Sequence, residues 1–105
     1  MPPSFREILA AVRDSLLSAE EPPRTAEEIN EGWCADFADA VWRLFGDGVE
    51  VVNDEDLGNV VYTHTFLKLG DRYYDSECLD GVDDWRQLPC LLRVEEWLQR
   101  GRAVK

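Results

Sequence analysis

Three residue types that together can carry out acyl transfer occur in this sequence in the order cysteine, histidine, carboxylate. The chain has one histidine, His64, so every histidine-dependent mechanism must pass through it. Cys34 precedes it and Asp75 follows it. In such a set the thiolate attacks a carbonyl carbon, the imidazole takes and returns a proton, and the carboxylate orients the ring. Each residue also has a purely structural interpretation, which for Cys34 is a small core side chain.

Cys34 is expected at the beginning of a helix, directly after Gly32 and Trp33. Unpaired backbone N–H groups and the positive end of the helix dipole favour a thiolate at such a position, and the same N–H groups can hold an oxyanion. Glu31 and Asp36 act in the opposite direction, because nearby carboxylates favour the neutral thiol. The helix start alone therefore does not activate Cys34, and a basic partner is needed.

The strand pattern after the cysteine indicates where the histidine would find its carboxylate. If Gly70-Asp71 is a two-residue hairpin turn, Phe66 pairs with Asp75 and His64 pairs with Glu77. His64 and Asp75 then share one face of the sheet as diagonal neighbours, roughly 7–8 Å or somewhat less apart between Cβ atoms. Glu77 is the alternative orienting carboxylate. A register shifted by one residue would remove both carboxylates from this face.

Two helices are expected ahead of these strands. Ser4 and Glu7 form a capping box before an amphipathic helix that is expected to end near Ser18 or Ala19. Thr25 begins a short capped turn that leads into a second helix, which stops at Gly46.

The second half of the chain reads as strands followed by one more helix. The expected elements are strands over Val49–Val52, Val60–Leu69 and Arg72–Asp75, a turn at Asp80-Gly81, and a helix through Val94, Trp97 and Leu98. Trp85 and Trp97 are expected in the core, whereas an exposed tryptophan would indicate a protein interface. Residues 1–105 therefore predict one α+β domain with helices packed on a small antiparallel sheet.

The segment Gly32-Trp33-Cys34-Ala35-Asp36-Phe37-Ala38 resembles the Gly-x-Cys-x-x-Phe-Ala start of the nucleophile helix in papain-like and transglutaminase-like proteins. The later segments His64-Thr65-Phe66-Leu67 and Gly70-Asp71-Arg72-Tyr73-Tyr74-Asp75 are similar to the strands that carry their histidine and aspartate. The resemblance covers roughly residues 30–81. It implies a minimal core of that type, with Cys34 as nucleophile, His64 as base and Asp75 as orienting group. It also implies peptidase, deamidase or acyltransferase chemistry on an amide or isopeptide bond, with a protein or peptide as substrate.

One element of the papain-like pattern is missing. Those enzymes commonly place a glutamine upstream of the cysteine to complete the oxyanion hole, and this chain has no glutamine before Gln87. Asn30 is the only amide nearby, and it either supports the oxyanion or caps a helix. Some members of this superfamily have lost activity, so a non-catalytic use of the same scaffold stays open.

The net charge of −11 restricts the class of partner. A surface this acidic repels phosphate backbones, so direct nucleic-acid binding is not expected. The charge either keeps a small protein soluble or attracts a basic protein surface. The second interpretation supports an alternative to the enzyme, namely an acidic protein-binding module or inhibitor, of the kind found among viral accessory proteins. The oligomeric state is left open.

No metal or other cofactor is expected. The three cysteines form no Cys-x-x-Cys pair and there is one histidine, which does not suit zinc. The acidic run 54–56 precedes Gly58 one position too early for a calcium loop and is expected to be solvated. No segment is long and apolar enough to span a bilayer. Met1–Leu17 lacks the pattern of a signal peptide, so we expect a cytoplasmic protein without a membrane partner.

Overall fold

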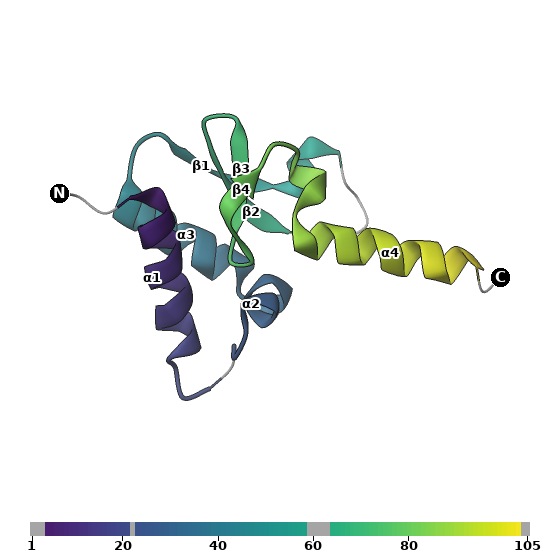
Figure 1. Cartoon of the computed structure of the whole chain (residues 1–105), viewed down its shortest axis with the longest axis horizontal. Coiled ribbons are helices and arrows are strands. Elements are labelled where there is room, and N and C mark those ends of the chain that lie inside the picture. The colour runs from purple at the N-terminus through teal and green to yellow at the C-terminus, as the bar shows by residue number, and fades with distance from the viewer. Residues whose placement is uncertain (1–3, 22, 59–63, 104–105) are drawn as a thin grey trace.

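The computed structural model describes residues 4–21, 23–58 and 64–103 (Figure 1). In chain order the elements are α1 (Phe5–Leu17), α2 (Ala26–Gly32), α3 (Cys34–Phe45), β1 (Val49–Asn53), the 3₁₀ turn η1 (Asp54–Leu57), β2 (Thr65–Leu69), β3 (Arg72–Asp75), β4 (Cys78–Val82), the 3₁₀ turn η2 (Trp85–Gln87) and α4 (Pro89–Ala103). The strands form one antiparallel sheet in the order β1-β2-β3-β4. The predicted α+β class, with helices packed on a small antiparallel sheet, is confirmed.

The first two helices begin at the predicted caps. The hydroxyl of Ser4 accepts a hydrogen bond from the backbone N–H of Glu7 at 3.2 Å, and that of Thr25 accepts one from Glu28 at 3.1 Å. Each cap satisfies a backbone donor that the helix itself leaves unpaired. Helix α1 ends at Leu17 with Ser18 as its C-cap, close to the predicted end near Ser18 or Ala19.

The capped turn expected after Thr25 is a short helix, and the helix expected to stop at Gly46 begins only after a break at Trp33. Helix α2 ends at Gly32, and Trp33 takes a non-helical backbone conformation with φ −128° and ψ 20°. The break follows glycine, which has a low helix propensity because it loses most backbone freedom on folding. As a result, Cys34 is the first residue of a separate helix.

The hairpin between β2 and β3 has the predicted register. Leu69 pairs with Arg72 and Lys68 with Tyr73 across a turn in which Gly70 has φ +63°. A positive φ suits glycine, which has no Cβ to clash with the backbone. Of the strand predicted over 60–69, Thr65–Leu69 is observed as β2, His64 lies directly before it, and residues 60–63 lie outside the described part of the chain.

The prediction of a turn at Asp80-Gly81 is wrong, because these residues lie within strand β4. The turn between β3 and β4 is instead formed by Ser76-Glu77. Gly81 keeps a turn-like φ of +81° inside the strand. A Cβ at this position would lie 2.6 Å from Cε2 of Tyr74, so glycine is required by close packing as well as by backbone conformation.

Apolar side chains pack on both faces of the sheet, because consecutive strand residues point to opposite sides. Leu67 faces a cluster shared with α1, α2 and α3. Its neighbour Phe66 faces a second cluster, formed with Leu88, Leu91 and Trp85 from η2 and the beginning of α4. The sheet therefore joins two small cores, with α1 and α3 on one and α4 on the other.

Helix α4 packs on the body only near its beginning and then runs away from the sheet (Figure 1). Leu91 is buried, whereas Trp97 two turns later is 69% exposed. The prediction that Trp97 lies in the core is therefore wrong. Within residues 4–21, 23–58 and 64–103, no helix combines the length and the apolar character needed to cross a membrane.

Candidate active site

Cys34 lies where the predicted chemistry needs it, at the first position of α3. Helix α3 has no side-chain cap, since Trp33 at the capping position carries no oxygen acceptor. The first backbone N–H groups of α3 are therefore not satisfied by a capping side chain. The thiol of Cys34 is half-buried and not part of a disulfide.

His64 immediately precedes β2, and Asp54 fixes its backbone from both sides. The backbone N–H of His64 donates to Oδ1 of Asp54 at 2.8 Å, and the backbone N–H of Asp54 donates to the carbonyl of His64 at 3.1 Å. Asp54 is fully buried, so the prediction that the whole run 54–56 is a solvated loop is wrong at this residue. No pattern in the sequence indicates this contact, because an acidic residue directly after a strand is common.

The imidazole of His64 contacts Asp75. Nε2 of His64 lies 3.1 Å from Oδ2 of Asp75, and both side chains are almost completely buried. This contact agrees with the β2–β3 register, which pairs Leu67 with Tyr74, the residue directly before Asp75. The other oxygen of Asp75 accepts the backbone N–H of Glu77 at 2.9 Å. Of the two candidate carboxylates, Asp75 is the one that holds the ring.

The thiol of Cys34 and the ring of His64 form a coupled pair. Burial raises the pKa of the Cys34 thiol, but the hydrogen bond and charge of His64, together with contacts from Thr65, lower it overall. Burial lowers the pKa of His64, yet hydrogen bonds with Asp75 and Cys34 outweigh this and raise it to about 9. These directions favour a thiolate beside an imidazolium.

The second ring nitrogen of His64 is the one available to the cysteine. Nε2 is engaged with Asp75, so the buried Nδ1 is the nitrogen left for the interaction with Cys34. Thr65, which sequence analysis did not single out, contacts the thiol of Cys34 and donates its hydroxyl to Oδ1 of Asn53 at 2.7 Å. The structure thus brings Cys34, His64 and Asp75 together and adds Thr65 beside the thiol.

Asn30 and Glu77 lie next to this set and contact each other. Nδ2 of Asn30 donates to Oε1 of Glu77 at 2.8 Å, while Oδ1 of Asn30 accepts the hydroxyl of Ser76 at 3.0 Å. Asn30 is buried within α2, whose cap is Thr25, so the prediction that Asn30 is a helix cap is wrong. Its described contacts join α2 to the β3–β4 turn.

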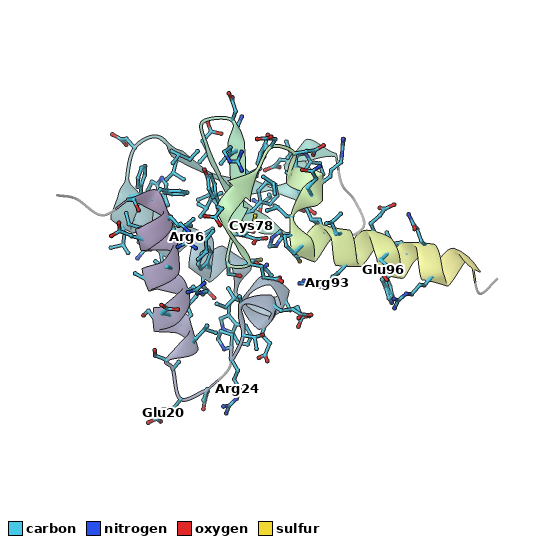
Figure 2. All side chains as sticks on the ribbon, in the orientation of Figure 1. Arg6, Glu20, Arg24, Cys78, Arg93 and Glu96 are labelled. Atoms are coloured by element: carbon cyan, nitrogen blue, oxygen red, sulfur yellow. The ribbon has the colours of Figure 1, made fainter. Side chains whose placement is uncertain are left out.

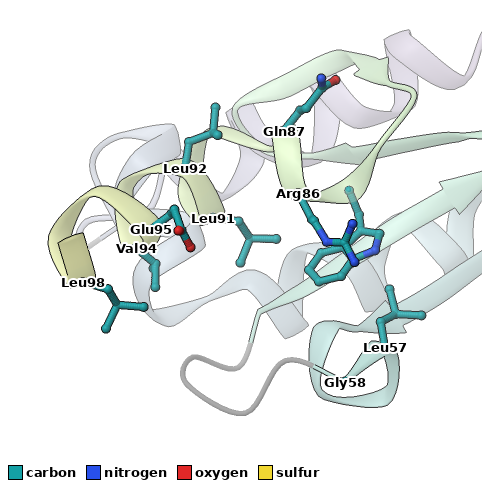
Figure 3. A pocket seen from close by; sticks show the side chains of 10 residues that line it. Leu57, Gly58, Arg86, Gln87, Leu91, Leu92, Val94, Glu95 and Leu98 are labelled. Atoms are coloured by element: carbon teal, nitrogen blue, oxygen red, sulfur yellow. The ribbon is translucent and has the colours of Figure 1, made fainter.

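A largely apolar groove of about 550 Å³ borders the second core, the one that contains Phe66. Trp85 and Leu91 belong to both the groove and this core. The ring of Trp85 stacks on Phe66 with centroids 6.1 Å apart, and the ring of Phe66 lies 5.7 Å from that of His64. The guanidinium of Arg86 lies over the ring of Trp85, 5.2 Å from its centroid, and Figure 3 shows Arg86 facing Leu91 of α4 across the groove. A row of rings therefore connects the candidate site with the groove.

Among the described residues, no group of three or more histidine, cysteine or acidic side chains is arranged to hold a metal ion. The side chains that the site brings together are a thiol, an imidazole and a carboxylate, which can support nucleophilic chemistry at a carbonyl carbon. Comparison of the chain with protein-family models, with curated proteins and with solved structures finds no match.

Proposed function

We propose that this protein is a thiol-dependent hydrolase or acyltransferase that acts on an amide or isopeptide bond. The observation that carries the proposal is the placement of the chain's one histidine, with Nε2 on the Asp75 carboxylate and the other side of the ring toward Cys34. The resemblance of the Cys34 helix start to papain-like and transglutaminase-like proteins supports the same chemistry.

In the first step, Sγ of Cys34 attacks the carbonyl carbon of the substrate. An S–C bond forms, and the negative charge moves to the carbonyl oxygen, which the uncapped N–H groups at the start of α3 can stabilise. His64 then gives its Nδ1 proton to the leaving nitrogen, and the C–N bond breaks. The products are a free amine and a thioester on Cys34.

In the second step, water or a substrate amine attacks the thioester carbonyl. Neutral His64 accepts the proton of the attacking group, the S–C bond breaks, and the electron pair returns to the thiolate. Asp75 keeps Nε2 protonated throughout, so that Nδ1 is the nitrogen that exchanges protons. Water gives hydrolysis, and an amine gives acyl transfer.

The proposed substrate is a protein or peptide, presented on a basic surface. With 22 acidic and 11 basic side chains, the protein attracts cationic partners and accelerates their association at low ionic strength. A chain of 105 residues suits a compact substrate or one presented by another protein. No cofactor is needed for this chemistry, because both steps use side chains of the protein.

The first experiment is to measure alkylation of Cys34 by iodoacetamide against pH, with mass spectrometry of the labelled peptides. We expect rapid labelling of Cys34 near neutral pH, and a loss of that low-pH reactivity in His64→Ala, because the imidazolium stabilises the thiolate. Cys78 in the same sample is the internal control, since burial and Asp75 raise the pKa of its thiol. Labelling of Cys34 that is indifferent to His64 would contradict the proposal.

Activity is then tested on basic peptides that carry glutamine amides or lysine isopeptide bonds, by following ammonia or amine release. Cys34→Ala is expected to abolish release, because it removes the nucleophile. Asp36→Ala, which removes a carboxylate from the same first turn of α3, is the matched control and retains the thiol. Equal release by wild type and Cys34→Ala would contradict the proposed chemistry.

A second candidate function is an acidic protein-binding module or inhibitor on the same scaffold. The observation that favours it is Trp97, which is 69% exposed on α4, together with the net charge of −11. This function predicts binding to a basic protein that weakens with salt and is unchanged in Cys34→Ala but reduced in Trp97→Ala. Loss of the biological effect in Cys34→Ala with binding intact would favour the enzyme.

A further inference from the structure

The side chain of Arg93 joins helix α4 to the β3–β4 turn. Its Nη1 donates to Oε2 of Glu77 at 2.8 Å, and its Nη2 donates to Oε1 of Glu77 at 2.7 Å. A pair of parallel N–H···O bonds fixes both the distance and the angle between the two groups. Arg93 extends from α4 into the space beside α2 (Figure 2), where its Nε also lies 3.5 Å from Glu27.

Glu77 is joined to the candidate site through its own backbone. Its N–H donates to Oδ1 of Asp75 at 2.9 Å, while Oδ2 of the same carboxylate contacts Nε2 of His64 at 3.1 Å. Both oxygens of Asp75 are thus engaged, one by the turn and one by the imidazole. A shift of the Glu77 backbone would rotate the carboxylate away from the ring.

The same turn is also tied to α2. Asn30 donates to the Glu77 carboxylate at 2.8 Å, and the hydroxyl of Ser76 donates to the carbonyl of Ala26 at 2.7 Å. The Glu77 side chain is only 16% exposed, so its pair with Arg93 is less screened by solvent than a surface ion pair. The turn is therefore held between two helices, with α4 supplying its positive charge.

We propose that Arg93 and Glu77 are positioning residues for the Cys34, His64 and Asp75 set, and that they hold the β3–β4 turn so that Asp75 orients His64. This inference rests on the proposed function, because it assigns a role in the same thiol chemistry. It makes α4 part of the machinery of the site, although no α4 side chain takes part in the bond changes.

The test compares Arg93→Met with Arg100→Met in the full-length chain. Arg100 pairs with Glu96 on the exposed side of the same helix, so this variant removes an arginine without touching the turn. Two titrations are measured, Cys34 alkylation against pH and the ring carbon NMR signal of His64. Since the chain has one histidine, this signal needs no assignment.

In Arg93→Met we expect the His64 midpoint to fall and Cys34 alkylation at neutral pH to slow about tenfold, which corresponds to one unit in pKa. Arg100→Met is expected to match wild type. Glu77→Gln should reproduce the Arg93→Met profile, and the double variant should be no worse than either, because the two residues act as one unit. Arg93→Lys, which keeps the charge without the paired geometry, should lie between wild type and Arg93→Met.

Unchanged midpoints in Arg93→Met or Arg93→Lys would overturn the positioning role, and so would equal effects of Arg93→Met and Arg100→Met. If Arg93→Met fails to fold, Arg93→Lys and Glu77→Gln decide the matter by the same titrations. Failure of the proposed function looks different. In that case wild type itself would show an ordinary thiol profile that does not respond to His64→Ala.

Discussion

Asp54 and His64 hold each other by two hydrogen bonds, one from each backbone N–H. The His64 N–H donates to the Asp54 carboxylate at 2.8 Å, and the Asp54 N–H donates to the His64 carbonyl at 3.1 Å. The first bond is accepted by the side chain of Asp54. Residue 54 therefore needs a side chain that places an acceptor oxygen at the distance of an aspartate carboxylate. Asp54 therefore fixes the strand end that carries the imidazole, while Asp75 fixes the ring.

Asp54→Ala is expected to destabilise the protein by about 1–3 kcal/mol, because the buried N–H of His64 loses its acceptor. Cys34 alkylation at neutral pH should also slow, since the ring is displaced. Urea unfolding and the alkylation assay measure the two effects. Asp54→Asn, which keeps an acceptor oxygen, should recover part of both, and Glu55→Ala in the same 3₁₀ turn is the exposed control. Equal behaviour of Asp54→Ala and Glu55→Ala would contradict this role.

Asp75→Asn is expected to reduce the proposed activity by about 10²–10⁴-fold. The amide can turn an N–H toward Nε2 of His64, which favours the wrong tautomer and leaves the imidazolium without its counter-charge. The midpoint of the His64 NMR titration should fall below about 9, because the carboxylate is one of the groups that raise it. A His64 midpoint that stays the same in Asp75→Asn would show that the carboxylate does not control the ring.

The coupled pair predicts an unusual pH dependence of stability. The raised pKa of His64 stabilises the folded state below about 6.5, and this contribution is lost as the pH rises toward about 9. The lowered pKa of Cys34 contributes in the opposite sense, because its stabilisation is present above its ordinary value of 9.0 and is lost as the pH falls. Between these limits the folded pair holds one proton, on His64, beside a Cys34 thiolate. The unfolded chain also holds one proton at these two residues, on the Cys34 thiol.

The free energy of unfolding should therefore be nearly constant from about pH 6.5 to about pH 9 as far as this pair is concerned. A histidine shifted alone to about 9 would instead lose about 3 kcal/mol over the same range. Urea unfolding at several pH values distinguishes the two cases. A steep loss of stability toward pH 9 would show that Cys34 stays a neutral thiol beside His64.

Gly81→Ala is expected to destabilise the fold much more than Gly70→Ala. Both glycines have positive φ, so each substitution introduces backbone strain of about 1 kcal/mol or more. Only at Gly81 would the new Cβ also meet a ring, at 2.6 Å from Cε2 of Tyr74, whereas nothing lies within 4 Å at Gly70. Urea midpoints of the two variants give the comparison. Equal destabilisation would mean that strand β4 can move away from Tyr74.

Local signals predicted much of the fold. The caps at Ser4 and Thr25 are short-range features, and both are confirmed. The Gly70-Asp71 turn determined the hairpin register and, through it, the contact between His64 and Asp75. These features depend on residues close together in the chain, where periodicity and turn chemistry are informative.

Features that depend on distant elements were missed or wrong. Asp80-Gly81 has the residue types of a turn but lies in β4, which pairs with β3. The pairing is irregular here, and Gly81 takes a positive φ beside the ring of Tyr74. Trp97 has the large apolar side chain typical of a core residue. It is exposed because α4 extends beyond the sheet (Figure 1). The ion pair of Arg93 and Glu77 joins a helix to a turn, and neither residue has a local pattern that indicates the other.

The absence of a capping side chain on α3 also restricts which residues position 33 can hold. A serine, threonine or aspartate at the capping position typically stabilises a helix by about 0.5–2 kcal/mol relative to a residue that cannot cap. Such a residue in place of Trp33 would occupy the N–H groups that lie beside the Cys34 thiol. Such a substitution would also remove the tryptophan that packs against the first core, so both packing and the open helix start favour a residue without a cap at position 33.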